Sequence, residues 1–110
     1  MKKYVPKEGD IVWLEFNPQA GHEQAGHRPA IVLSKKAYNE KTGLAIFCPI
    51  TSKSKGYPFE VKVEGSKISG VVLADQIKSL DWQSRNAKFL ERAKPSVLKS
   101  VLSKFMVIID

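Results

Sequence analysis

Residues 21–29 gather several side chains that could carry out catalysis. Their sequence, GHEQAGHRP, contains both histidines of the chain together with a carboxylate, an amide and a guanidinium. Apolar runs at residues 11–16 and 30–33 flank this stretch. A loop that only joins two strands does not need such chemistry, and binding and catalytic residues concentrate on loops held by a rigid sheet. We therefore interpret the loop as half of an active site for a polyanionic substrate.

The charge of the chain agrees with a polyanionic partner. The formal net charge is +7, and residues 31–110 carry the whole excess, because basic and acidic residues balance in residues 1–30. A basic surface attracts phosphate backbones and acidic proteins. From charge alone, a nucleic-acid-binding protein and a soluble domain with a lysine-rich surface both remain open.

The residue pattern disfavours several kinds of catalytic site. His22, Glu23 and His27 lie close together, but zinc usually takes three or four ligands, and no metal site is predicted. Cys48, the only cysteine, lies within an apolar run and is interpreted as a core residue. The chain has neither a Gly-x-Ser-x-Gly nucleophile elbow nor a Gly-x-x-x-x-Gly-Lys-Ser/Thr phosphate loop.

Ribonuclease chemistry requires less from the protein, because the 2′-hydroxyl of RNA is itself the nucleophile. The protein must take one proton, supply another to the leaving 5′-oxygen and neutralise charge on the phosphate. Arg28 offers a planar, charged donor array for the phosphate, and Glu23 or His22 could act as the base. No metal or cofactor is implied. Surface roles for the same residues remain open at this point.

Hydrophobic patterning predicts a mainly β fold. Strands are expected at residues 11–16, 30–33, 44–48, 59–64, 71–74 and 88–92. Pro29 is expected as the first residue of its strand and Pro49 at a strand exit, because proline cannot donate to a ladder. Short strands at this spacing, followed by a late helix, favour a small antiparallel barrel or an α+β sheet.

Two helices and a helical turn are also expected. Ser34 is predicted to cap a short helix at residues 35–38 that ends at Gly43. Pro95 suits the first position of a second helix, whose apolar face contains Val97, Leu98, Val101, Leu102 and Phe105. Residues 81–84 are expected to form a helical turn, and residues 106–109 a last strand or an extension of the second helix.

Length and composition place these elements in one domain, residues 1–110. Hydrophobic residues make up 43% of the chain, enough for a core. No signal peptide is recognised, and no apolar run reaches the ~18 residues of a membrane span. A single cysteine fits a reducing cytoplasm.

Five segments in order along the chain carry a resemblance to a known family. They are GDIVW at residues 9–13, GHEQAGHRP at 21–29, PITS at 49–52, SKGYPFEV at 54–61 and GVVLADQIKS at 70–79. Together they resemble the MazF/PemK (Kid) toxins of bacterial type II toxin–antitoxin systems, and the MazF branch in particular. The similarity runs from Tyr4 to the C-terminus without large gaps.

The resemblance implies an SH3-like small antiparallel barrel with a C-terminal helix and short inserted helices, assembled as a twofold homodimer. It implies a metal-independent, sequence-specific endoribonuclease (an mRNA interferase) that cuts single-stranded mRNA and stops translation and growth. The products would carry a 2′,3′-cyclic phosphate and a 5′-hydroxyl. The partner would be a cognate antitoxin whose acidic tail occupies the RNA groove, in the bacterial cytoplasm.

The resemblance also implies site residues. Arg28, Thr51 and Glu23 match the expected catalytic positions, with Arg28 as charge stabiliser and proton donor, since arginine is a poor base. Leu73 stands where the Kid branch has an arginine with an acid role, so that role does not transfer. The residues expected to contact RNA are His22, Gln24, His27, Lys53, Lys55, Asp75 and Gln76.

Two other functions are compatible with such a barrel. Gyrase-poisoning toxins share the fold without cutting RNA, and an inactive barrel could serve as a peptide-binding module. The presence of both Arg28 and Thr51 together with the polar loop favours the ribonuclease.

Overall fold

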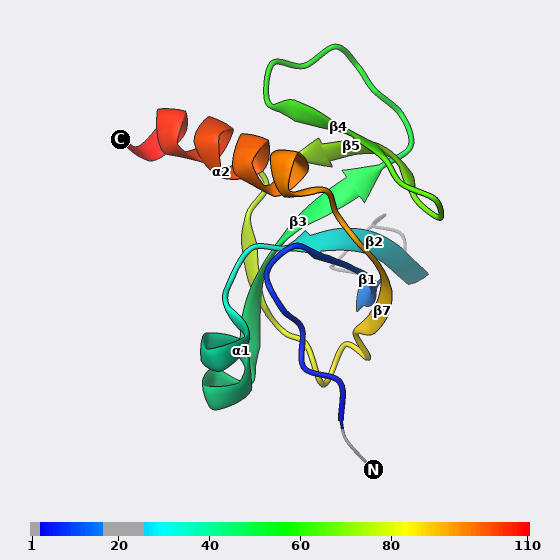
Figure 1. Cartoon of the computed structure of the whole chain (residues 1–110), viewed down its shortest axis with the longest axis vertical. Helices are drawn as coiled ribbons and strands as arrows, with labels where there is room; N and C mark the ends of the chain where they lie inside the picture. The colour runs from blue at the N-terminus through cyan, green and yellow to red at the C-terminus, as the bar shows by residue number, and fades with distance from the viewer. Residues whose placement is uncertain (1–2, 17–25) are drawn as a thin grey trace, which may run out of the picture.

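The computed structural model describes residues 3–16 and 26–110, which fold mainly as β-structure with one long helix (Figure 1). The elements of this part are β1 (Asp10–Phe16), β2 (Gly26–Val32), α1 (Lys36–Thr42), β3 (Leu44–Thr51), β4 (Glu60–Glu64), β5 (Ser69–Leu73), β6 (Lys78–Asp81), β7 (Lys88–Arg92) and α2 (Pro95–Ile109). The mainly β architecture with a C-terminal helix and a short inserted helix is confirmed.

The strands form one curled antiparallel sheet in the order β4-β5-β3-β2-β1-β7, and β6 also pairs with β3. β3 is the central strand and changes partners along its length. Its first residues pair with β6 and β2, whereas Ile50 and Thr51 pair with Val72 and Val71 of β5. This change of partner bends the sheet into two parts that share β3 (Figure 1).

Both prolines lie inside strands, contrary to the predicted boundaries. Pro49 does not end β3, which continues to Thr51. It is the last β3 residue that pairs with β2, and Ile50 and Thr51 pair with β5 on the other side of β3. Pro29 is the fourth residue of β2, outside the Ala30–Val32 stretch that pairs with β3. A missing N–H is tolerated where a ladder ends or changes partner.

β6 was not predicted as a strand. Lys78–Asp81 pairs with the start of β3. Of its four residues Leu80 is half-buried and the other three are exposed. A short edge strand with one inward apolar side chain gives no alternating signal. The residues that follow, 82–86, form hydrogen-bonded turns in which the Arg85 N–H donates to the Asp81 carbonyl, in agreement with the expected helical turn.

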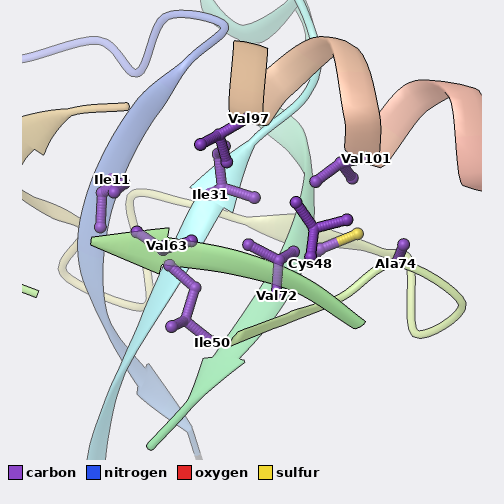
Figure 2. Close-up of a cluster of buried hydrophobic side chains, with 10 residues drawn as sticks. Ile11, Ile31, Cys48, Ile50, Val63, Val72, Ala74, Val97 and Val101 are labelled. Carbon is purple, nitrogen blue, oxygen red and sulfur yellow. The ribbon is translucent and has the colours of Figure 1, made fainter. Parts of the chain in front are cut away.

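Two apolar clusters lie on opposite faces of the β1–β2–β3 region. The first, covered by α2, contains Ile11, Ile31, Cys48, Ile50, Val61, Val63, Val72, Ala74, Val97 and Val101 (Figure 2). The second contains Val12, Leu14, Ala30, Val32, Ala45, Phe47 and Trp82. Strands buried on both faces explain why these segments read as continuous apolar runs instead of alternating ones.

Cys48 is a fully buried member of the first cluster, which confirms its interpretation as a core residue. Burial raises the pKa of its thiol to about 12, with a smaller contribution from the Asp75 carboxylate. A thiol with so high a pKa is not a nucleophile near neutral pH.

The helix α2 begins at Pro95 as predicted and continues through residues 106–109 as a helix extension. Val97 and Val101 face the sheet in Figure 2, and α2 packs beside β4. Its last turns are exposed and apolar. In the described part of the chain, no helix is long and apolar enough to cross a membrane.

The buried Asp10 carboxylate joins the N-terminal segment to β7. It accepts hydrogen bonds from the Tyr4 hydroxyl at 2.6 Å and the Lys7 N–H at 3.0 Å, and Arg92 Nη1 lies 2.6 Å from its second oxygen. Burial and the bond to Asp10 raise the pKa of the Tyr4 hydroxyl. The N-terminal segment and the end of β7 are thus both tied to the start of β1 through one carboxylate.

Asn39 performs a similar task at α1. Its buried side-chain amide donates to the carbonyls of Pro6 and Ser34, and its backbone carbonyl accepts the Trp82 indole N–H at 2.9 Å. The prediction that Ser34 caps α1 is wrong. The cap position is Lys35 without a side-chain bond, and the Ser34 hydroxyl donates to Asn39 Oδ1 and accepts the Ile46 N–H. Gly43 ends the helix as predicted, with φ 76°.

Replacing Asn39 by Ala should destabilise the protein by about 3 kcal/mol, since it leaves buried partners of one amide without hydrogen bonds. Urea unfolding measures the change. The control is Glu40→Ala, an exposed neighbour on the same helix, for which the free energy of unfolding should stay nearly constant. An equal effect of the two substitutions would contradict the structural role of Asn39.

Candidate active site

Arg28 and Thr51 lie at the same end of the β2–β3 ladder. These strands are antiparallel, and the last pair of the ladder is Ala30 with Pro49. Arg28 and Thr51 each stand two residues beyond this pair, on β2 and β3 respectively. The register therefore places at one end of the ladder two residues that the sequence resemblance had singled out.

The same two side chains also share a face of the sheet. Side chains alternate along a strand, so Arg28 points to the side of Ala30 and Val32, which belong to the second cluster. Thr51 points to the side of Phe47, a member of the same cluster. Arg28 is exposed and Thr51 half-buried, so a guanidinium and a hydroxyl emerge together at the open end of this face.

Gly70 permits the close approach that fixes Thr51. β5 lies against the end of β3, and a Cβ atom built on Gly70 would overlap the carbonyl oxygen of Thr51. The φ of Gly70, 153°, is also one that residues with side chains rarely adopt. Gly70 was part of a matching motif, but its contact with Thr51 depends on a pairing that sequence patterns do not specify.

His27 lies on the opposite face from Arg28 and Thr51. Its ring stacks on Trp13, with centroids 6.0 Å apart and planes 8° from parallel, and its Nε2 is 3.8 Å from Glu15 Oε2. His27 is therefore not brought together with the Arg28–Thr51 pair. The other loop residues predicted for the site, His22, Glu23 and Gln24, lie outside the described residues.

Lys53 and Lys55 lie on an exposed loop, residues 52–59, directly after Thr51; we call it the basic loop. Glu60 holds its centre: the Ser54 hydroxyl donates to one carboxylate oxygen at 2.6 Å and the Lys55 N–H to the other at 2.9 Å. These bonds lower the pKa of Glu60, and the bond from the Lys55 backbone has the largest effect. The Lys53 N–H approaches Thr51 Oγ1 at 3.4 Å.

Tyr57 connects the basic loop to the turn that contains Asp75 and Gln76. The Tyr57 hydroxyl donates to Asp75 Oδ2 at 2.6 Å, and this bond raises the pKa of the phenol. Gln76 is exposed, and its N–H donates to the Leu73 carbonyl at 3.1 Å. Tyr57 and Glu60 were quoted within the SKGYPFEV motif, but sequence reasoning assigned neither a role.

A cavity of about 550 Å³ lies between the basic loop and the β4–β5 hairpin. Ser54, Tyr57, Glu60, Lys62 and Gly70 are among the residues that line it. The charged residues in its lining are Glu60, Lys62 and Glu64, whereas Arg28, Thr51, Lys53 and Lys55 lie outside the lining. Within residues 3–16 and 26–110, no three His, Cys, Asp or Glu side chains gather where they could hold a metal ion.

Comparison with protein families matches residues 7–109 to the family described as PemK-like, MazF-like toxin of type II toxin–antitoxin system. The chain belongs to this family. It is 48% identical over 109 residues to the endoribonuclease toxin MazF of Escherichia coli K12, covering 99% of this chain and 98% of that one. It is 34% identical over 116 residues to the endoribonuclease toxin ChpB of the same strain, covering 100% and 99%.

Solved structures of this toxin family agree. A MazE–MazF crystal structure from Deinococcus radiodurans matches with a TM-score of 0.91 and 55% identity, covering 97% of each chain, and a MazF crystal structure from that organism matches with a TM-score of 0.89. The predicted family, the predicted fold and the assignment to endoribonuclease toxins are thereby confirmed.

The contact between Gly70 and Thr51 generates a prediction. Gly70→Ala should destabilise the toxin by about 3 kcal/mol, because the new methyl group meets backbone that cannot rotate away. Gly43→Ala is the control: its φ is also positive, at 76°, but no atom lies within 4 Å of the new Cβ, so about 1 kcal/mol is expected. Urea unfolding compares them, and equal losses would show that φ alone matters at Gly70.

Proposed function

We propose that this toxin cleaves single-stranded RNA, mainly mRNA, at specific sequences through attack of the RNA's own 2′-hydroxyl on the adjacent phosphorus. The products are a 2′,3′-cyclic phosphate and a 5′-hydroxyl, and cutting mRNA inhibits translation and growth. The observation that best supports this chemistry is the position of Arg28 and Thr51 on one face, next to the basic loop.

In this mechanism Arg28 binds the non-bridging oxygens of the scissile phosphate and stabilises the charge that grows on them in the transition state. Its fork of N–H donors fits a phosphate in two places at once. We assign to it the proton that the leaving 5′-oxygen takes up, which the guanidinium then regains from water. The Thr51 hydroxyl holds the same phosphate by a hydrogen bond. Glu23 is proposed as the base that takes the 2′-hydroxyl proton.

The remaining predicted residues bind the RNA strand on either side of the cut. Lys53 and Lys55 contact neighbouring phosphates from the basic loop. His27, stacked on Trp13, offers a flat surface for an unpaired base on the opposite face of the hairpin. His22, Gln24 and Gln76 complete the RNA contacts that we propose. No metal or cofactor takes part in these steps.

A cognate antitoxin with an acidic tail is the proposed protein partner. The similar MazF of Deinococcus radiodurans has been crystallised with MazE. The net charge of +7 and the exposed lysines of the basic loop suit an acidic, extended peptide that competes with RNA. We place this pair in the bacterial cytoplasm, where the mRNA substrate is found.

We further propose that the toxin is a homodimer that uses the exposed face of α2. Leu102, Met106 and Ile109 form one stripe along the helix and are 39%, 51% and 58% exposed. An uncovered apolar stripe of this kind is typical of a protein interface. The stripe lies beside the residues that pack on the sheet, so a second copy could extend the existing core.

Arg28→Ala should lower kcat/KM for cleavage of a single-stranded RNA by about 10²–10³-fold, since it removes the main charge stabiliser. Cleavage is measured in EDTA on a labelled RNA, and the ends of the products are identified. Lys36→Ala, which removes one positive charge from exposed α1, is the control and should cleave as the wild type does.

Full cleavage by Arg28→Ala with an intact fold would exclude Arg28 from the mechanism. Cleavage by the wild type only after a divalent cation is added would contradict the metal-independent chemistry.

Met106→Lys should convert the dimer to monomers, because it places a charge in the centre of the apolar stripe. Analytical ultracentrifugation measures the mass in solution. Ser100→Lys adds the same charge to an exposed position on a different side of α2 and should leave the dimer intact. A dimeric Met106→Lys variant would show that another surface joins the copies.

A further inference from the structure

The basic loop is held mainly by side-chain bonds, with backbone bonds only to the carbonyls of Tyr57 and Phe59 at its end. Glu60 fixes Ser54 and Lys55 at its centre, and Lys104 of α2 donates to the Pro58 carbonyl at 2.8 Å. Between these anchors lies Gly56, with φ 71° and nothing within 4 Å of its Cβ position, so packing does not restrain this part. The side chain that restrains it is Tyr57.

Tyr57 reaches out of the loop to Asp75. Its ring is 45% exposed and lies 5.7 Å from the ring of Phe59, while its hydroxyl donates to Asp75 Oδ2 at 2.6 Å. This is a strong hydrogen bond between an uncharged donor and a carboxylate. It joins two segments 18 residues apart in the sequence.

Asp75 stands on a rigid support. The preceding residue, Ala74, is fully buried, and its N–H donates to the Phe59 carbonyl at 2.9 Å. The Gln76 N–H closes the turn on Leu73. A group bonded to Asp75 is therefore fixed relative to the core of the barrel.

Neither oxygen of Asp75 is free at the surface to meet RNA. Oδ2 accepts the Tyr57 hydroxyl, and Oδ1 is buried, with no hydrogen-bond partner among the described residues. The carboxylate also contributes to the raised pKa of Cys48, as expected for a group that lies against the first cluster. A carboxylate so placed is poorly positioned to accept a proton from a substrate or to touch a strand that is itself anionic.

We propose that Asp75 is a positioning residue that acts through Tyr57: it holds the basic loop in the shape in which Lys53 and Lys55 meet RNA phosphates. The inference rests on the proposed function, because it assigns a role in RNA binding by that same site. The physical gain is preorganisation. A loop ordered before the substrate arrives loses less conformational entropy on binding.

The test is a double-mutant cycle. Tyr57→Phe and Asp75→Ala should each raise KM for single-stranded RNA by about 5-fold with kcat unchanged, because each removes the same hydrogen bond. The double variant should show the same increase of about 5-fold and not the product of about 25-fold. Asp75→Asn keeps an oxygen that can accept the Tyr57 hydroxyl, so its KM should stay within about 2-fold of the wild type.

Tyr38→Phe is the matched control, since Tyr38 is 43% exposed on α1 and the substitution removes the same single hydroxyl. Its KM and kcat should equal those of the wild type. Thermal unfolding of every variant separates an effect on the loop from loss of the fold. Tyr57→Phe removes only an exposed hydroxyl and therefore keeps the test available even where Asp75→Ala unfolds.

The hydrogen bond between Tyr57 and Asp75 can also be tested by spectroscopy in the absence of RNA. Because Asp75 raises the pKa of Tyr57, ultraviolet titration should show one tyrosine ionising at lower pH in Asp75→Ala than in the wild type. Tyr57→Phe identifies that tyrosine, since its signal disappears. If the wild type cuts no RNA but this shift is seen, the proposed function fails while the bond stands.

Three results would overturn the proposal. The first is a large fall in kcat in Asp75→Asn with KM unchanged, which would place Asp75 in the chemistry. The second is a double variant whose increase in KM equals the product of the increases in Tyr57→Phe and Asp75→Ala. That result would show independent roles for the two residues, including direct contact of Asp75 with RNA. The third is a Tyr57 titration that does not respond to Asp75→Ala.

Discussion

The register between β2 and β3 is the constraint on which the site depends. Only Ala30, Ile31 and Val32 pair with β3, and the ladder ends at the pair of Ala30 with Pro49, next to Pro29. Neither proline has an N–H that could extend the ladder. β3 then pairs with β5, while β2 continues beside β1 alone. A shift of one residue in this short ladder would turn either Arg28 or Thr51 to the other face of the sheet. The two clusters on either side of the strands oppose such a shift, because it would expose one apolar set and bury polar groups.

Polar side chains hold segments of the chain that lie outside the β-ladders. Asp10 ties the N-terminal segment to β7, Asn39 ties α1 to the second cluster, and Glu91 accepts three backbone N–H groups from the turn at residues 66–68. Burial alone would raise the pKa of Glu91, but these bonds lower it. Glu60 does the same for the basic loop. Asp10, Glu91 and Glu60 each order a neighbouring segment as one acceptor with two oxygens, whereas Asn39 acts chiefly as a donor through its amide nitrogen.

Much of this arrangement could be predicted from the sequence, and the exceptions have physical reasons. The apolar runs gave most strands, and Pro95 and Gly43 gave the start of α2 and the end of α1, because each signal is local. β6 was missed since an exposed edge strand with one inward leucine has no periodic pattern. Ser34 was misjudged because a distant backbone N–H, that of Ile46, competes for its hydroxyl.

The residues of the candidate site also fall into two groups, those that local motifs identify and those whose roles depend on distant partners. Arg28 and Thr51 could be named from motifs, but their common face follows from a pairing register that motifs do not contain. The roles of Tyr57, Glu60 and Gly70 depend on partners elsewhere in the chain. His27 belongs to the same sequence motif as Arg28. Because side chains alternate along a strand, it lies on the opposite face of the sheet, next to Trp13 and Glu15.

The position of α2 in the chain has a consequence for how the toxin is made. Val97 and Val101 cover the first cluster, whose other members come from strands that the ribosome completes earlier. Until this helix emerges, the face of β3 that contains Cys48 and Ile50 remains open to water, and the strand that carries Thr51 lacks its support. The complete fold, and with it the site that we propose, therefore forms only once the last residues of the chain have been made.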